Sequence, residues 1–146
     1  MVAAVGRDQD AGRFGSVPRN VRIQPWVPQV ELLRHASVFV THGGFNSTKE
    51  ALSQGVPLVV LPLGADQFHT AERVEALGLG VGVPPDDRDA ARLRTRVRKV
   101  LEVPDYRRRA TAFAAEIAAL PPLSEAVRLI ERLARDREPI RRSSLD

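Results

Sequence analysis

The chain has 146 residues, of which 43% are hydrophobic and 27% are charged, a composition typical of one globular domain with its own core. It contains no cysteine, which excludes disulfide bonds and thiolate metal ligands. No apolar run approaches the roughly 18 residues of a membrane span, and no signal segment opens the chain, so we expect a soluble, cytoplasmic protein with no membrane partner.

The formal net charge of +4 makes nucleic-acid binding one class of function to consider. Most of the excess basic residues lie after residue 88, where arginines alternate with apolar residues such as Leu93, Val97 and Val100. This spacing is typical of an amphipathic helix whose basic face is solvated. We therefore expect no nucleic-acid partner, and an anionic partner for this helix is the alternative.

Five short apolar runs, bounded by turn-forming residues, predict β-strands. In chain order they are Val2–Val5, Val21–Gln24, Val38–Thr41, Leu58–Leu61 and Val81–Val83. Segments with helical periodicity or helix-start residues predict helices at Val30–Ala36, Asn46–Gln54, Asp66–Gly78, Asp89–Glu102, Asp105–Ala119 and Ser124–Arg137.

This order of elements predicts an α/β fold with a Rossmann-like parallel sheet of about five strands. The strands are almost continuously apolar, which indicates that helices cover both faces of the sheet. Asp86, Asp87 and Asp89 mark the start of the first helix after the last strand, because carboxylates cap free amides there. We expect one domain over residues 1–138 and a flexible tail over residues 139–146.

The most informative segment runs from Trp26 to Gln67 and reads WVPQVELLRHASVFVTHGGFNSTKEALSQGVPLVVLPLGADQ. At Thr41–Gly44 a predicted strand ends, two glycines turn the chain and a helix begins. Glycines let a ligand approach the backbone closely, and free amides at a helix start attract anions. The turn therefore suits a diphosphate, although ordinary turn chemistry would also explain two glycines at this point.

Polar and aromatic side chains around this turn suit a sugar nucleotide. Ser47 and Thr48 offer hydroxyl groups, and His42 offers a ring N–H. Glu50 lies one helical turn further on, where a carboxylate can accept hydrogen bonds from a ribose diol. Trp26 offers a flat surface on which a base can stack. Taken singly, each of these residues could instead serve packing or local hydrogen bonding.

Taken together, the segment resembles the donor-binding signature of UDP-dependent glycosyltransferases with the GT-B fold. It is most similar to bacterial macrolide glycosyltransferases, whose C-terminal domain carries WVPQ, HGG, ST-x-EAL, GVP and DQ in this order. Plant members have Trp where this chain has Phe45, and Cys where it has Gly43. The resemblance implies a hexosyltransferase of natural-product or antibiotic metabolism.

The resemblance also implies a role for each matching position in binding a UDP-sugar donor. Contacts to the base are implied for Trp26, Gln29 and the backbone of Val27, and contacts to the ribose hydroxyls for Glu50. Contacts to the diphosphate are implied for His42, Asn46, Ser47 and the backbone at Gly44. Contacts to the transferred sugar are implied for Asp66 and Gln67, with the ring of Phe45 nearby.

The implied mechanism is inverting transfer of the hexose to a hydroxyl group of a small-molecule acceptor, without a metal or another cofactor. The helix start and His42 stabilise the charge on the departing diphosphate. The general base that takes the acceptor proton is, in this family, a histidine of the N-terminal domain. We therefore expect no catalytic residue in this chain, and structural or surface roles for His35 and His69.

The first strand of the family's C-terminal domain would precede Met1 of this chain. In the strand order 3-2-1-4-5-6 that strand is central, so we expect unpaired edges at Val2–Val5 and Val38–Thr41, together with an incomplete donor site. Three interpretations follow from this expectation. The chain is an inactive fragment of a glycosyltransferase, the donor-binding subunit of a split glycosyltransferase, or a sugar-nucleotide-binding module.

Overall fold

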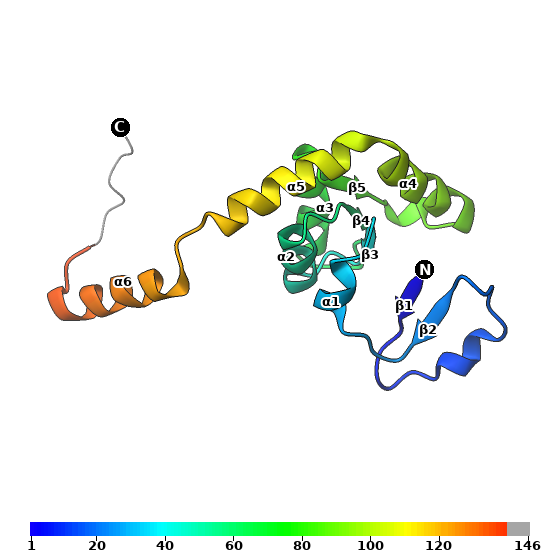
Figure 1. Ribbon diagram of the computed structural model, residues 1–146, viewed down its shortest axis with the longest axis horizontal. Helices are drawn as coiled ribbons and strands as arrows, with labels where there is room; N and C mark the ends of the chain where they lie inside the picture. Colours follow the sequence, from blue (N-terminus) through cyan, green and yellow to red (C-terminus); the bar gives the residue numbers. More distant parts are fainter. Residues whose placement is uncertain (140–146) are drawn as a thin grey trace.

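The computed structural model describes residues 1–139, in which short strands alternate with helices (Figure 1). The strands are β1 (Val2–Ala4), β2 (Arg22–Gln24), β3 (Phe39–Thr41), β4 (Leu58–Val60) and β5 (Gly80–Gly82). The helices are α1 (Gln29–Leu33), α2 (Phe45–Ser53), α3 (Gln67–Ala76), α4 (Ala90–Glu102), α5 (Pro104–Ala118) and α6 (Leu123–Asp136). Two short 3-10 helices, Ala11–Phe14 and Pro85–Asp87, lie in loops. The predicted strands and helices are confirmed, and only their ends differ, by a few residues.

The five parallel strands form two sheets, which are divided between the edges that we expected to be unpaired. β1 pairs with β2, and β3, β4 and β5 pair in that order. Within residues 1–139, no backbone hydrogen bond joins β1 to β3, and Figure 1 shows the β1–β2 pair set to one side of the other sheet. The sheet is therefore divided at the place where the family's strand order predicts two unpaired edges.

β4 lies at the centre of the core, and its three side chains are fully buried. Successive side chains of a strand point to opposite faces. Leu58 and Val60 pack in one cluster with residues of α2, α3 and α5, whereas Val59 packs in a second cluster with Val100 of α4. Helices therefore cover both faces of the three-stranded sheet, as predicted. Burial of each such side chain contributes about 1.5–3 kcal/mol to folding.

Arg107 on α5 fastens the loops at the end of the sheet where β3 begins. One terminal nitrogen of its guanidinium donates to the carbonyl of Gly55, 2.8 Å away, just after α2. The other donates to the carbonyls of Ala36 and Ser37, each 2.7 Å away, just before β3. A half-buried cation on α5 therefore satisfies three carbonyls from two loops.

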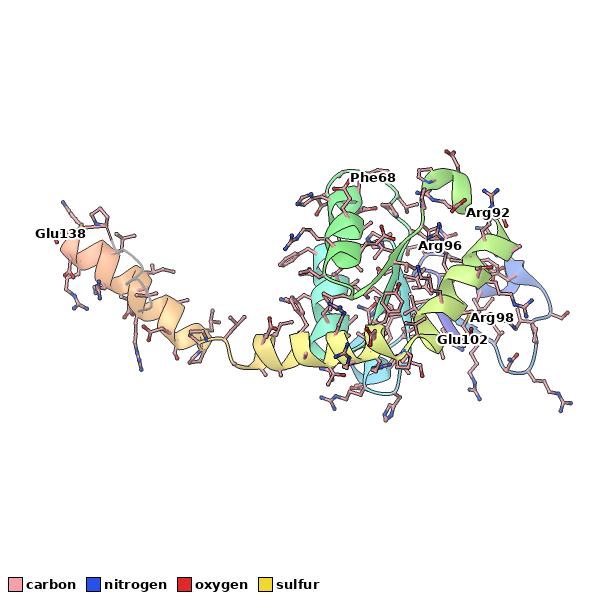
Figure 2. The ribbon with its side chains drawn as sticks, turned by 90° about the horizontal axis from the view of Figure 1, so that it is seen from above. Phe68, Arg92, Arg96, Arg98, Glu102 and Glu138 are labelled. Atoms are coloured by element: carbon pink, nitrogen blue, oxygen red, sulfur yellow. The ribbon has the colours of Figure 1, made fainter. Side chains whose placement is uncertain are left out.

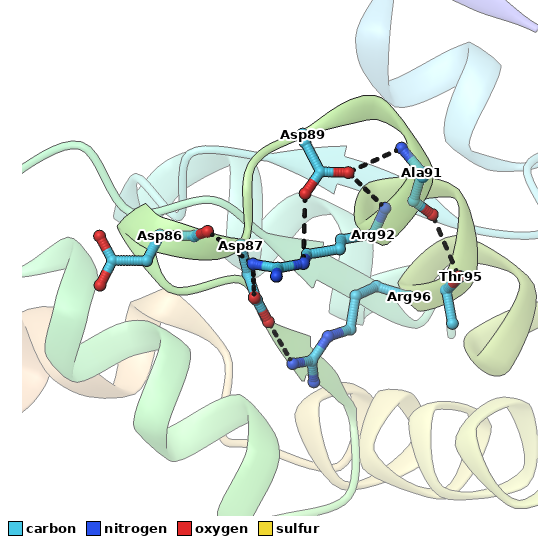
Figure 3. Close-up of polar contacts among 7 residues, drawn as sticks. All are labelled: Asp86, Asp87, Asp89, Ala91, Arg92, Thr95 and Arg96. Atoms are coloured by element: carbon cyan, nitrogen blue, oxygen red, sulfur yellow. Dashed lines mark hydrogen bonds and ion pairs between the residues drawn. The ribbon is translucent and has the colours of Figure 1, made fainter.

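The predicted start of α4 is confirmed, but only one of the three acidic residues caps it (Figure 3). Asp89 accepts hydrogen bonds from two first-turn amides, at 3.0 and 2.9 Å. Asp87 instead forms ion pairs with Arg92 and Arg96, each at 2.8 Å. The hydrogen bond from Arg96, and then the charges of both guanidinium groups, lower the pKa of the Asp87 carboxyl. Asp86 contributes only its backbone carbonyl, which accepts from Arg92.

α6 extends away from the sheets, as the two views in Figure 1 and Figure 2 show. None of its residues is buried, and its apolar side chains, including Leu123, Val127 and Ile130, are exposed. Apart from Pro139, the tail predicted over residues 139–146 lies outside the described residues, and the domain boundary at residue 138 stays a prediction. Between residues 1 and 139, no helix is both long enough and apolar enough to cross a bilayer.

Candidate functional site

The residues predicted to form the site lie on segments that follow the carboxyl ends of strands. Trp26 follows β2, His42 follows β3 and Asp66 follows β4. In a parallel sheet such segments meet at one edge, where ligands of open α/β folds bind. A hydrogen bond from Gln29 to Glu50 also joins the segment after β2 to the helix after β3.

The turn after β3 requires glycine at position 43 and packs closely at position 44. Gly43 has φ +90°, and a Cβ built there would lie 2.7 Å from Cγ1 of the buried Val60 and 3.6 Å from the carbonyl oxygen of Gln67. A Cβ at Gly44 would lie 2.7 Å from Nε2 of His42. The turn therefore packs closely against both β4 and the start of α3, and the ring of His42 lies directly against its backbone.

α2 begins at Phe45 immediately after this turn, with an uncapped start. Gly44 is the N-cap residue and supplies no side chain to bond the free amides. The first backbone bond into the helix runs from the Thr48 amide to the Gly44 carbonyl, at 3.0 Å. Phe45 and Asn46 are exposed, and Ser47 is half-buried. The amides of the first turn and the positive end of the helix dipole are therefore open to an anion.

Gln29, which lies on α1, contacts two side chains of this helix, Ser47 and Glu50. The side-chain nitrogen of Gln29 donates to Oε2 of Glu50 at 2.7 Å, and it lies 3.4 Å from Oγ of Ser47. The carboxylate of Glu50 has a second oxygen that can accept from a ligand. The hydroxyl oxygen of Thr48, in contrast, is buried with no partner in the described part of the chain.

Trp26 remains 56% exposed on the loop after β2, and Val27 beside it is half-buried. An exposed indole is unusual for packing and suits a stacking surface. The guanidinium carbon of Arg7 lies 5.0 Å from the centroid of the Trp26 ring. Our sequence analysis did not single out Arg7. The only signal was a basic residue on the loop that follows the neighbouring strand.

Asp66 and Gln67 lie where the loop after β4 enters α3. Oε1 of Gln67 accepts hydrogen bonds from the amides of Leu63 and Gly64, at 2.8 and 3.2 Å, so this oxygen holds the loop and the amide nitrogen remains to donate. Asp66 is exposed, and its carboxylate caps no amide. Ala65 before it has φ 52°, a conformation that non-glycine residues adopt at an energetic cost.

The remaining rings near the site include one aromatic and two histidines. Phe45 is 70% exposed, so its ring is free to contact a ligand. His35 lies in the exposed turn after α1, and His69 on α3 is exposed 3.7 Å from Glu72. Neither histidine lies at the turn after β3. Across residues 1–139, no group of three or more histidine or acidic side chains is placed to hold a metal ion.

A groove of about 560 Å³ lies along α4 rather than at these segments. Its walls include Asp87, Arg92, Arg96 and Lys99, and two of these cations already pair with Asp87. The opposite face of α4, which includes Val100, packs on the sheet. The interpretation of this basic segment as an amphipathic helix is therefore confirmed.

Comparison with known proteins identifies the family. Residues 2–133 match the family described as erythromycin biosynthesis protein CIII-like, C-terminal domain. The chain is 48% identical over 97 residues to NDP-glycosyltransferase YjiC of Bacillus licheniformis, which is 66% of this chain and 24% of that protein. It is 32% identical over 131 residues to oleandomycin glycosyltransferase of Streptomyces antibioticus, which is 90% of this chain and 30% of that protein.

A solved structure supports the same assignment. The glycosyltransferase VinC, whose crystal structure was determined in complex with DTDP, superposes with a TM-score of 0.85 at 31% identity. The superposition covers 92% of this chain and 34% of VinC. The chain therefore spans between a quarter and about a third of the proteins it matches.

Proposed function

This chain belongs to the family of erythromycin biosynthesis protein CIII-like C-terminal domains, and on that premise we propose that it is the donor-binding domain of a glycosyltransferase. It binds a UDP-sugar at the segments that follow β2, β3 and β4. Within a complete glycosyltransferase it supports transfer of a hexose to a hydroxyl group of a small-molecule natural product. Because the chain spans only part of its relatives, the transfer reaction is proposed for the complete enzyme.

The hydrogen bond between Gln29 and Glu50 is the observation that carries this proposal. It joins the segment after β2, which also carries the exposed ring of Trp26, to α2, whose start is uncapped. These segments would receive the base, the ribose and the diphosphate of one nucleotide. Trp26 would stack on the base, Glu50 would accept from the ribose hydroxyls, and the first-turn amides of α2 would donate to the diphosphate.

The same groups support departure of the diphosphate during transfer. The acceptor oxygen attacks the anomeric carbon from the side opposite the leaving oxygen, so the configuration is inverted. As the bond to the diphosphate breaks, negative charge accumulates on its oxygens. N–H donors at the start of α2, together with His42, stabilise that charge more in the transition state than in the ground state. We propose that this stabilisation replaces a metal ion.

The sugar end of the donor would lie at the loop between β4 and α3. The Asp66 carboxylate accepts from hexose hydroxyls, and the Gln67 amide nitrogen donates to them. Phe45 offers an apolar surface nearby. We assign no residue of this chain as the general base, because the resemblance to the family implies that this base belongs to the N-terminal domain. The proton of the acceptor would pass to a group outside this donor-binding domain.

Two pyrimidine nucleotides are candidates for the donor. The sequence resembles UDP-dependent enzymes, whereas the similar VinC was crystallised with DTDP. Both nucleotides share a pyrimidine ring and a diphosphate, but dTDP lacks the ribose 2′-hydroxyl and carries a methyl group at C5 of its base. Since the Glu50 carboxylate would bind a ribose diol, we propose that the chain prefers UDP.

Isothermal titration calorimetry of the 146-residue chain with UDP, dTDP and a UDP-hexose tests the proposal. We expect saturable binding of UDP and of the UDP-hexose, and weaker binding of dTDP. A mixed-sequence DNA duplex serves as the control for attraction of any anion to a basic chain. Binding of the duplex without saturable binding of either nucleotide would contradict the donor site.

A further inference from the structure

Arg7 and Trp26 lie on neighbouring loops because the strands before them are paired. Ala4 and Gln24 are partners in the parallel β1–β2 sheet, and the Val5 amide continues the ladder to the Gln24 carbonyl at 3.0 Å. The loops after β1 and β2 therefore leave the sheet side by side. Parallel pairing brings Arg7 to the ring of Trp26 across 19 residues of sequence.

The guanidinium of Arg7 covers one face of the Trp26 indole. Its carbon lies 5.0 Å from the ring centroid, within the range of a cation–π contact of about 6 Å. Trp26 is 56% exposed with Arg7 in place, so much of the ring surface that Arg7 leaves uncovered is open. Within residues 1–139, Arg7 forms no ion pair with a carboxylate. The indole is its principal partner.

We propose that Arg7 is a positioning residue of the nucleotide site, which holds the Trp26 ring so that a pyrimidine base stacks on the opposite face. The result is a stack of guanidinium, indole and base. This inference rests on the donor site proposed above and adds to it a residue from the loop after β1. The planar guanidinium suits this task because it stacks flat on an aromatic ring, which an ammonium group cannot do.

The size of the effect follows from how firmly Arg7 holds the ring. An exposed cation–π contact favours one ring orientation over others by a factor of about 2 to 5. Without Arg7, the fraction of molecules that present the ring correctly falls by up to that factor, and the apparent dissociation constant rises in proportion. Arg7→Gln should therefore weaken UDP binding about 2- to 5-fold. Arg7→Lys should have a smaller effect.

The same loop offers a matched control in Arg13. Its guanidinium lies over Phe14, 5.8 Å from that centroid, and not over Trp26. Arg13→Gln removes the same charge from the same loop, so it measures the contribution of general electrostatic attraction. We expect the affinity of Arg13→Gln for UDP to equal that of the parent chain.

Trp26 is the only tryptophan of the chain, so its fluorescence reports on the contact without a nucleotide. A cation on the ring attracts iodide and repels caesium. Iodide should therefore quench the parent chain and Arg13→Gln more strongly than Arg7→Gln, and caesium should quench them less strongly. Equal quenching of all three proteins by both ions would show that Arg7 does not cover the ring, and would overturn the inference.

Calorimetry with UDP then separates the inference from the function on which it rests. Weaker binding by Arg7→Gln alone supports the stack. Unchanged or tighter binding by Arg7→Gln overturns it, since tighter binding would mean that Arg7 competes with the base for the ring. If the parent chain binds no UDP although the quenching is asymmetric, the contact exists but the donor site is wrong, and the proposed role of Arg7 is lost with it.

Discussion

Replacement of Gly43 by alanine tests the geometry of the turn that aims the start of α2. Gly43 has φ +90°, and an added Cβ would lie 2.7 Å from Cγ1 of Val60, a side chain with no exposed surface. The backbone conformation costs a non-glycine residue about 1–3 kcal/mol. The contact with a packed valine adds about 1–3 kcal/mol, as overpacking of a core does. Gly43→Ala should therefore lower the free energy of unfolding by about 2–6 kcal/mol.

Two other glycines separate these contributions. Gly15 has φ +63° with no atom within 4 Å of an added Cβ, so Gly15→Ala should show only the backbone cost, about 1–3 kcal/mol. Gly64 has an equally open position without a positive φ. Gly64→Ala should leave stability unchanged or raise it by about 0.4–1 kcal/mol, because alanine restricts the unfolded chain.

Urea unfolding followed by circular dichroism at 222 nm measures all three variants under the same conditions. We expect the free energy of unfolding to decrease in the order Gly64→Ala, Gly15→Ala, Gly43→Ala. If Gly43→Ala were as stable as Gly15→Ala, the close packing of the turn against β4 would be refuted. A correctly folded Gly43→Ala protein should also bind UDP less tightly, since the turn sets the direction of the first-turn amides of α2.

Three further changes test other parts of the structure. Glu50→Ala should weaken UDP binding by about 1–3 kcal/mol, or roughly 5- to 150-fold in calorimetry, as loss of hydrogen bonds to a charged group does. Glu116→Ala on α5 is the control and should leave UDP binding unchanged. Equal affinities of Glu50→Ala and the parent chain for UDP would refute the ribose contact. Arg107→Met should lower the free energy of unfolding by about 1.5–3 kcal/mol in urea, because three carbonyls lose a charged donor. Arg108→Met, which loses one exposed ion pair, should lower it by less than about 0.5 kcal/mol. Similar losses in the two variants would show that the bonds from Arg107 to the loop carbonyls do not stabilise the fold. The pKa of Asp87 is lowered in the folded chain. The stability that the Asp87 carboxylate contributes is therefore complete above its unfolded-state pKa of about 4 and is lost as the pH falls through the folded value. Asp87→Asn should lose less stability than the parent chain between neutral pH and about pH 3, and parallel losses would show that the ion pairs with α4 contribute nothing.

The elements could be predicted from the sequence because local patterns determine them. Runs such as Leu58–Val60 are short, apolar and bounded by glycine and proline, and they became the strands. The division between β1 and β3 could be predicted from the strand order of the family. The glycine turn at Gly43 could be predicted from the sequence. The close contact of Gly43 with Val60 could not be predicted, because it depends on how β4 packs beneath the turn.

Contacts between distant residues could not be predicted, because no local pattern encodes them. Arg107 reads as one more basic residue of an amphipathic helix, yet its partners lie 52 to 71 residues away in the chain. Gln67 matched a sugar-binding motif, and the structure gives its oxygen a second task in holding the loop before α3. The contact between Arg7 and Trp26 could not be predicted, because it depends on the parallel pairing of β1 with β2.

We propose that the uncapped start of α2 binds the diphosphate of a nucleotide sugar. The most direct test is titration of the uniformly ¹⁵N-labelled chain with UDP, with backbone amide shifts followed by heteronuclear NMR. We predict that UDP causes saturable changes in the amide chemical shifts of residues 43–47 and in the shift of the Trp26 indole N–H, with small changes along α4. Shifts concentrated on the arginines of α4, with none at the start of α2, would contradict it.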